Sequence, residues 1–223
     1  MIAEFEKMGR MSWFSHLDLQ STMQRAMRRA DLPVRYSQGF NPHVNLSFAT
    51  ALSVGCQSRC EILDVELAGE ITEDAFIEAL NAALPEELRC SRAALIEDNA
   101  PALMALMNEA QYEVTVQGVD LTAAVEEFRN AEEVMAEKRS KTKTRMVNIR
   151  PMVHEISCAY DGSNSVLTMI VEQTNANCLK PDLLMQTLAP GAFCRTVRTG
   201  FFAKGKDGGR IGLFEAGMGK AAE

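Results

Sequence analysis

Apolar and polar positions alternate with two different periods over the first hundred residues. Residues 2–7 alternate at every second position, as a half-buried strand does. A helical period runs from residue 16 to 30, with Ser15 as the expected N-cap and Pro33 barring continuation. The remaining elements predicted here are extended segments at 34–36, 46–52 and 59–67, a helix at 72–84 and a strand at 88–96. The order is therefore strand, helix, strand, strand, helix, strand.

The same order starts again after residue 110. The predicted elements are strands at 111–117, 152–160, 166–173 and 195–202, helices at 120–130 and 181–188, and a hairpin of 133–138 with 145–149. We expect an α+β fold of two tandem ferredoxin-like (βαββαβ) units with antiparallel sheets. Residues 1–98 form the first unit, 99–110 a linker and 111–203 the second unit. Residues 204–223 hold six of the fourteen glycines and are expected to form a flexible tail.

Composition and cysteine spacing narrow the class of protein. An apolar fraction of 47% with 24% charged residues is ordinary for a globular chain. No run of eighteen apolar residues occurs, and acids stand where a signal peptide needs bases, so we expect a cytoplasmic protein without a membrane segment. The C-x3-C pair of Cys56 and Cys60 lacks a third thiolate for an iron–sulfur cluster, and we expect neither metal nor cofactor. Cys90, Cys158 and Cys194 are expected as small buried thiols on strands.

Charge is segregated along the chain, although the net charge is only −7. Residues 1–60 carry a net charge of +3 and residues 134–150 carry +5, whereas residues 61–133 carry −15. An exposed basic patch attracts phosphates whatever the distant charge, so the two basic segments indicate an anionic ligand, with ordinary surface charge as the alternative.

Three arginines fall on one exposed side of the helix predicted at 16–30. They are Arg25, Arg28 and Arg29, and Arg35 follows shortly after Pro33. The planar guanidinium fork suits phosphate oxygens better than a lysine does. The basic stretch 138–145 would extend this patch if it met the helix, and the sequence leaves that open.

The segment 35–43 has the composition of a loop that presents side chains for binding. Gly39 permits a positive φ, and Asn41 with Pro42 favours a turn. Aromatic faces on which a base could stack come from Tyr36, Phe40 and His43. For Phe40 the alternative is a plug in the hydrophobic core, which is the favoured interpretation of that residue. The candidate substrate-binding residues are Arg25, Arg28, Arg29, Arg35, Tyr36, Ser37, Gly39, Phe40, Asn41 and His43.

Two of the three histidines are candidates for acid–base catalysis. His16 begins the first helix, where the helix dipole favours the neutral imidazole, and His43 lies in the loop. Together they could act on a phosphodiester if the loop folds back over the helix N-terminus. A packed or hydrogen-bonded histidine is the more common role at a helix start.

Several short motifs in the first 67 residues resemble the radical-SAM-linked family, a bacterial domain of unknown function. Its members are encoded beside, or fused to, an uncharacterised radical SAM (S-adenosylmethionine) protein. The resemblance implies a separate member that works with a radical SAM protein in trans, and it carries no established catalytic residues. Val44, Ser53 and Ile62 depart from the family pattern. The motifs are Gly9, Ser15-His-Leu-Asp18, Arg25-Ala, Arg28-Arg-Ala30, Leu32-Pro33, Tyr36-Ser37, Gly39-Phe-Asn-Pro-His43 and Val54-Gly55.

Three hypotheses follow for the function. The first is a radical SAM-associated accessory protein, a non-catalytic subunit that binds an anionic substrate, RNA above all, for a separate radical SAM enzyme. The second is a metal-independent RNA-processing or RNA-modifying enzyme that uses His16 and His43. The third is a module that only docks to other proteins.

Overall fold

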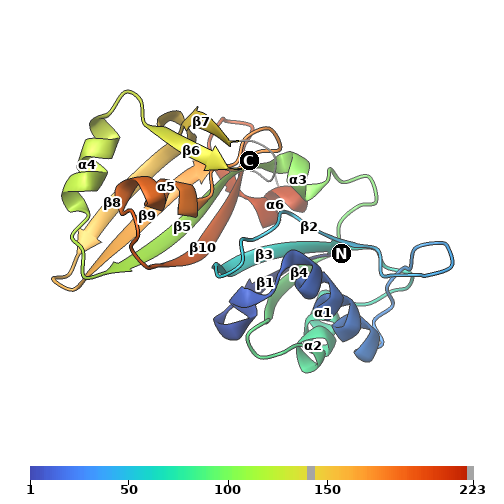
Figure 1. Ribbon diagram of the computed structural model, residues 1–223. Coiled ribbons are helices and arrows are strands. Elements are labelled where there is room, and N and C mark those ends of the chain that lie inside the picture. The colour runs from blue at the N-terminus through green and yellow to red at the C-terminus, as the bar shows by residue number, and fades with distance from the viewer. Residues whose placement is uncertain (140–143, 220–223) are drawn as a thin grey trace. The chain divides into compact units, whose positions relative to one another are not determined.

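The computed structural model describes residues 1–139 and 144–219. The chain forms two compact units, one built from Met1–Met107 with Phe201–Glu223 and the other from Asn108–Gly200 (Figure 1). Helices alternate with strands that pair mainly antiparallel, so the prediction of a mixed α+β protein is confirmed.

The first unit has a sheet of the order β4-β1-β3-β2 with antiparallel pairing throughout. Its strands are β1 (Ile2–Lys7), β2 (Leu46–Phe48), β3 (Gln57–Val65) and β4 (Cys90–Ala94), and its main helices are α1 (His16–Arg29) and α2 (Glu73–Ala83). A 3-10 helix, η1 (Gly9–Trp13), precedes α1, and the short α3 spans Leu103–Leu106. The predicted extended segment at 34–36 is reduced to isolated bridges, Val34 with Leu67 and Tyr36 with Val44.

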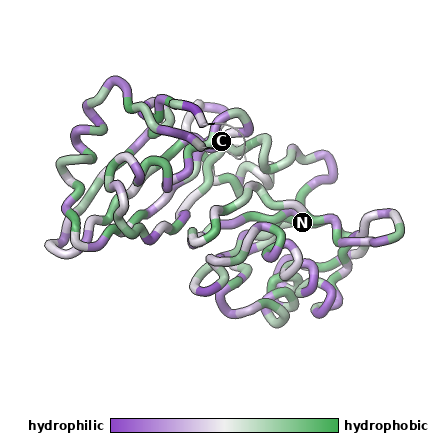
Figure 2. Tube along the Cα trace, in the orientation of Figure 1, coloured by the Kyte–Doolittle hydropathy of each residue, from purple (hydrophilic) through white to green (hydrophobic). Residues whose placement is uncertain are grey.

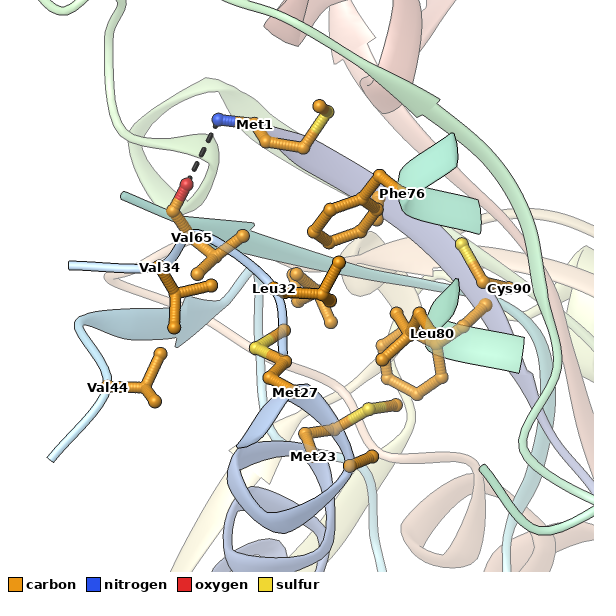
Figure 3. Packing of buried hydrophobic residues seen from close by; sticks show 14 of the residues in the cluster. Met1, Met23, Met27, Leu32, Val34, Val44, Val65, Phe76, Leu80 and Cys90 are labelled. Carbon is orange, nitrogen blue, oxygen red and sulfur yellow. Dashed lines mark hydrogen bonds between the residues drawn. The ribbon is translucent and has the colours of Figure 1, made fainter. Parts of the chain in front are cut away.

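The core of this unit lies between the sheet and its two helices. Phe5 of β1 and Leu63 of β3 are fully buried, and Met23, Met27 and Phe76 from the helices pack in the same cluster (Figure 3). Buried and half-buried positions alternate along β1 from Ala3 to Lys7, as expected for a strand that buries one face more than the other, and Figure 2 shows hydrophobic and hydrophilic residues interspersed along the chain. Each fully buried large side chain contributes about 1.5–3 kcal/mol, so this packing fixes the position of α1.

The segment just before α1 is held in place by the buried side chain of Lys7 and by the close packing of Gly55. Lys7, 1% exposed, donates from Nζ to the carbonyl oxygen of Phe14 at 2.8 Å, just before the helix begins. Gly55 has φ +87°, and a Cβ there would lie 3.4 Å from the ring of Trp13. The Gly55 amide also donates to the carbonyl of Ser12, so the loop after β2 is fastened to η1.

The second unit has a sheet of the order β10-β5-β9-β8. Asp161 accepts bonds from the amides of Ser163 and Asn164, which closes the predicted turn between β8 and β9. A separate two-stranded hairpin, β6 with β7, forms as predicted. The elements are β5 (Met107–Gln117), α4 (Thr122–Asn130), β6 (Met135–Arg139), β7 (Thr144–Asn148), the 3-10 helix η2 (Arg150–Met152), β8 (Val153–Tyr160), β9 (Asn164–Glu172), α5 (Pro181–Leu188) and β10 (Cys194–Lys204).

The structure differs from the expected linker and tail. Within 99–110, α3 forms and β5 already begins at Met107. Within 204–219, β11 (Arg210–Gly212) pairs with β10, and α6 (Leu213–Gly217) follows, while residues 220–223 of the expected tail lie outside the described residues. The flexible tail was predicted from its glycine content. Residues 204–219 are nevertheless ordered, because they contact residues distant in sequence, which local periodicity does not reveal.

α6 is anchored to the rest of the first unit by a charged and aromatic cluster. The Arg92 guanidinium lies 4.1 Å from the centre of the Phe214 ring, which is buried. It also donates to both carboxylate oxygens of Glu4 at 2.9 Å and to Glu215. Gly217 packs so closely that a Cβ would lie 2.7 Å from Leu103.

Candidate nucleic-acid interface

α1 begins with a complete capping box. The Ser15 hydroxyl accepts from the Asp18 amide at 3.2 Å, and the Asp18 carboxylate accepts from the Ser15 amide at 3.1 Å. The bonds from Ser15 hold the pKa of Asp18 below its ordinary value. The capping box and the buried apolar stripe together fix which residues of α1 face solvent.

Arg28 joins the last turn of α1 to the predicted binding loop. Its Nη2 donates to the carbonyl of Pro42 at 3.4 Å, and its guanidinium carbon lies 5.7 Å from the centre of the Tyr36 ring. Figure 1 shows this loop, between α1 and β2, projecting from the first unit. Helix and loop are therefore parts of one surface.

The base of the loop is closed by Ser37 and His43. The Ser37 amide donates to the carbonyl of His43 at 2.8 Å, and the His43 amide donates to the Ser37 hydroxyl at 3.1 Å. The same hydroxyl lies 3.0 Å from Nδ1 of the His43 ring, which holds the imidazole in place. His43 is thus a positioned and exposed ring rather than a freely rotating one.

Phe40 stands at the tip of the loop, fully exposed at 111%. The favoured expectation, that it plugs the core, is wrong. Gly39 before it has φ +128°, and a Cβ there would meet nothing within 4 Å, so the backbone turns the phenyl ring into open solvent. Tyr36 is 39% exposed, so two aromatic rings of this loop are accessible.

The other arginines of the patch are divided between different neighbours. Arg25 is exposed and makes no hydrogen bond or ion pair with another described residue. Arg29 donates to the carbonyl of Ala83 at 2.6 Å and is thereby drawn to the end of α2. Arg35 lies 3.7 Å from Glu66 in an exposed ion pair. Of these four arginines, Arg28 is the one whose side chain bonds to the loop among the described residues, and Arg35 has a carboxylate that competes for it.

The two catalytic candidates are not connected. His16 contacts the edge of the Phe48 ring, with the ring centres 5.3 Å apart, whereas His43 is bonded to Ser37. His16 begins α1, and Arg28, which contacts the loop, is twelve residues further on, about 18 Å along a helix axis. Among the described residues, no hydrogen bond joins His16 to His43.

The second basic stretch lies on the β6–β7 hairpin of the other unit. Lys138 donates to the carbonyl of Cys178 at 3.1 Å, and Arg145 on β7 is exposed. Residues 140–143, which include Lys141 and Lys143, lie outside the described residues.

The thiols and carboxylates do not assemble into a metal site in the part of the chain that the structure describes, where no three His, Cys, Asp or Glu side chains gather suitably. None of the six cysteines, all of them among the described residues, forms a disulfide, and Cys90 is buried on β4, while Cys158 and Cys194 are only half-buried on β8 and β10. No described helix is long and apolar enough to cross a membrane.

A cavity in the second unit was missed by the sequence analysis. It measures about 570 Å³ and lies where the end of α4 and η2 meet the sheet. Arg129, Arg150 and His154 line it together with neutral polar side chains. The lining residues come from five separate elements, β5, α4, η2, β8 and β9, so no local motif could have indicated the site.

Residues 1–181 match the family described as "Uncharacterized protein conserved in bacteria (DUF2344)". The chain belongs to this family. The comparison with curated proteins finds no match for this DUF2344 member.

Two solved structures resemble the DUF2344 chain. A chain of a Cbf5-Nop10-Gar1 complex matches with a TM-score of 0.52 and 12% identity, over 90% of this chain and 48% of that one. A chain of the archaeal box H/ACA sRNP Nop10-Cbf5 complex matches with a TM-score of 0.41 and 11% identity, over 88% and 46%. This chain thus spans about half the length of each, and the first likeness shows a shared fold alone.

Proposed function

We propose that this protein is a cytoplasmic, non-catalytic binding subunit that holds RNA for a separate radical SAM enzyme. The RNA contacts are assigned to the surface formed by the last turn of α1 and the loop at 36–43, here called the α1–loop surface. The radical SAM partner rests on the sequence resemblance alone.

The observation that carries the RNA proposal is the exposed ring of Phe40, which stands at the tip of the loop that the Arg28 guanidinium contacts. A fully exposed phenyl ring offers a face to any base, and stacking on an aromatic side chain contributes about 1–3 kcal/mol per base. Single-stranded RNA presents unstacked bases and phosphates together.

Charge on the α1–loop surface favours a polyanion. From Arg35 to Asn45 the chain contains no acidic residue. Arg28, exposed in the last turn of α1, contacts this loop, and Arg25 is exposed one turn earlier on the same helix; each guanidinium is suited to a phosphate oxygen. In this proposal Asn41 and the fixed ring of His43 contact base edges, while the arginines contact the backbone.

The strand orders support the more specific fold assignment, two tandem ferredoxin-like units. Numbered within each unit, both sheets have the order 4-1-3-2, and helices follow the first and third strands in each. The hairpin β6–β7 is then an insertion in the second unit. Ferredoxin-like domains use many different surfaces, so the function rests on the side chains and not on this assignment.

The test is RNA binding by fluorescence anisotropy, with labelled single-stranded and duplex RNA at several salt concentrations. We expect tighter binding of the single strand and a negative slope of log K against log salt. Phe40→Ala should weaken binding about tenfold at every salt concentration, since stacking is not ionic. Arg28→Ala should weaken binding and make the slope shallower by about one.

Arg59→Ala is the matched control, because Arg59 is an exposed arginine on β3 outside the α1–loop surface. It should bind RNA as the unchanged protein does. Equal affinity of the Phe40→Ala, Arg28→Ala and Arg59→Ala proteins would refute the RNA proposal. The partner proposal is tested separately by purification from host extract with and without ribonuclease, which should retain an iron–sulfur radical SAM protein.

A further inference from the structure

The cavity of the second unit has the dimensions of a small-molecule site. Its volume of about 570 Å³ lies within the usual range for ligand pockets. It opens where α4 ends beside β8, elements that Figure 1 shows next to each other. Every residue that lines it belongs to the second unit, so the site is complete within residues 108–200.

Arg150 supplies this cavity with a fixed positive charge. Its two terminal nitrogens donate to main-chain carbonyls, of Arg129 at 2.9 Å and of Val153 at 3.3 Å. Its Nε is buried without a hydrogen-bond partner among the described residues. Carbonyl oxygens orient a guanidinium without neutralising it, so the group keeps both its charge and an unsatisfied donor.

The other charged groups around the cavity leave it cationic. Arg129 pairs with Glu126 at 3.0 Å, with both side chains more than half exposed, so that pair is weak and readily exchanged. His154 is bonded to Glu109. Among the lining residues, Glu155 is the single carboxylate against two guanidinium groups.

Neutral polar side chains complete a mixed lining. Gln111, Ser157 and Thr168 line the cavity, and none of their side chains makes a hydrogen bond to another described residue. Ile156 and Ile170 supply apolar contact beside them. Guanidinium groups, open amide and hydroxyl groups, and an apolar wall are what a phosphate, a base edge and a sugar require.

We propose that this cavity binds a nucleotide, with the phosphate against Arg150 and Arg129 and the nucleoside along Gln111, Ser157 and Thr168. The proposal does not rest on RNA binding by the α1–loop surface, which belongs to the other unit. The nucleotide can be free or one unit of an RNA chain, and the chemistry recognised is the same.

Titration calorimetry with AMP and UMP tests the proposal, with adenosine, uridine and inorganic phosphate as partial ligands. We expect at least one nucleotide to bind saturably and at least about tenfold more tightly than its nucleoside or phosphate alone. Arg150→Gln should weaken nucleotide binding about tenfold or more. Arg129 is exposed, so Arg129→Gln should leave the protein folded and weaken nucleotide binding severalfold. This second variant tests the proposal if Arg150→Gln fails to fold.

Lys180→Gln is the control, since Lys180 is an exposed cation of the same unit outside the cavity. It should leave nucleotide affinity unchanged. The proposal is overturned if no nucleotide saturates the protein up to about 5 mM, if phosphate alone binds as tightly as the nucleotides, or if Arg129→Gln and a folded Arg150→Gln bind as Lys180→Gln does.

A pentanucleotide RNA distinguishes the source of the ligand in a Phe40→Ala, Arg28→Ala double variant. If the pentanucleotide binds this variant more tightly than AMP does, and if adding Arg150→Gln removes that difference in affinity, the ligand of the cavity is a nucleotide within RNA. If the pentanucleotide binds no more tightly than AMP does, the ligand of the cavity is a free nucleotide. If the double variant no longer binds RNA at the α1–loop surface but still binds AMP, the cavity is a site separate from that surface.

Discussion

The guanidinium carbon of Arg28 lies 5.7 Å from the centre of the Tyr36 ring, while the neighbouring Arg29 bonds to the carbonyl of Ala83. Two successive arginines of one helix therefore support different parts of the first unit. Arg28 belongs to the α1–loop surface, and Arg29 links the ends of α1 and α2. This difference provides a matched pair of variants.

Arg28→Ala and Arg29→Ala should have different effects. Loss of Arg28 removes the contacts with Tyr36 and Pro42, so hydrogen exchange in the loop at 36–43 should become faster and RNA affinity should fall. Loss of Arg29 should lower the free energy of unfolding by about 1 kcal/mol and leave loop exchange unchanged. Exchange measured by mass spectrometry checks both, and equal loop exchange in the two variants would contradict the assignment.

Gly55→Ala should destabilise the first unit by about 1–3 kcal/mol. The methyl group would meet the Trp13 ring at 3.4 Å, and φ +87° is strained for any residue with a side chain. Gly118→Ala is the comparison, because Gly118 has φ +72° but nothing within 4 Å of the added carbon. Urea unfolding should show the larger loss at Gly55, and the difference between the two measures the Trp13 contact.

Arg92→Ala should loosen α6 from the first unit. The substitution removes charge-assisted bonds to Glu4 and Glu215 and the cation over Phe214, at a cost of about 1–3 kcal/mol in a partly exposed setting. Limited proteolysis should then cleave between residues 205 and 219 sooner than in the unchanged protein. Arg89→Ala, an exposed arginine just before β4, should alter neither stability nor cleavage.

Asp18→Asn should change how the stability of the protein depends on pH. The pKa of Asp18 is lowered in the folded state from an ordinary value of 3.8, so its ionised form stabilises the fold above that value. This contribution is lost as the pH falls through the lowered folded pKa. The difference in unfolding free energy between Asp18→Asn and the unchanged protein should be constant above about pH 5 and shrink toward pH 2. A difference that stays the same down to pH 2 would argue against the capping box as a source of stability.

Cys90 should be the slower to react of the two thiols on β4 and β8. Burial raises the pKa of Cys90 to about 11, so almost no thiolate exists at pH 8, while Cys158 is half-buried. Iodoacetamide at pH 8 should modify Cys158 at least about tenfold faster, as followed by peptide mass spectrometry. In concentrated urea the two rates should converge.

Local signals predicted α1 closely, because Ser15, Asp18 and the apolar stripe act within one helix. The same holds for the loop, where Gly39 and Asn41-Pro42 specify turns without reference to distant residues. The exposure of Phe40 could not be predicted, since an aromatic residue between two turn residues suits a core and a projecting tip equally well. Burial is decided by the whole fold and not by the neighbouring positions.

Neither the formation of α6 nor the presence of the cavity could be predicted from local sequence, for the same reason. Arg92, more than a hundred residues away, lies over the buried ring of Phe214 and is itself bonded to Glu4. Gln111, Arg150 and Thr168 line one cavity although nearly sixty residues separate the first from the last. Such contacts depend on which strands pair, and pairing is a property of the complete sheet.

The first unit is discontinuous in sequence, since it takes in Phe201–Glu223 after the whole of Asn108–Gly200. During synthesis on the ribosome, the second unit can therefore finish folding while the first still waits for its last helix. Until residue 217 emerges, Leu103 lacks the close cover that Gly217 gives it, and Arg92 lacks Phe214. A nascent chain of which residues 1–200 alone have left the ribosome would thus carry one complete unit and one in which Leu103 and Arg92 lack their partners on α6.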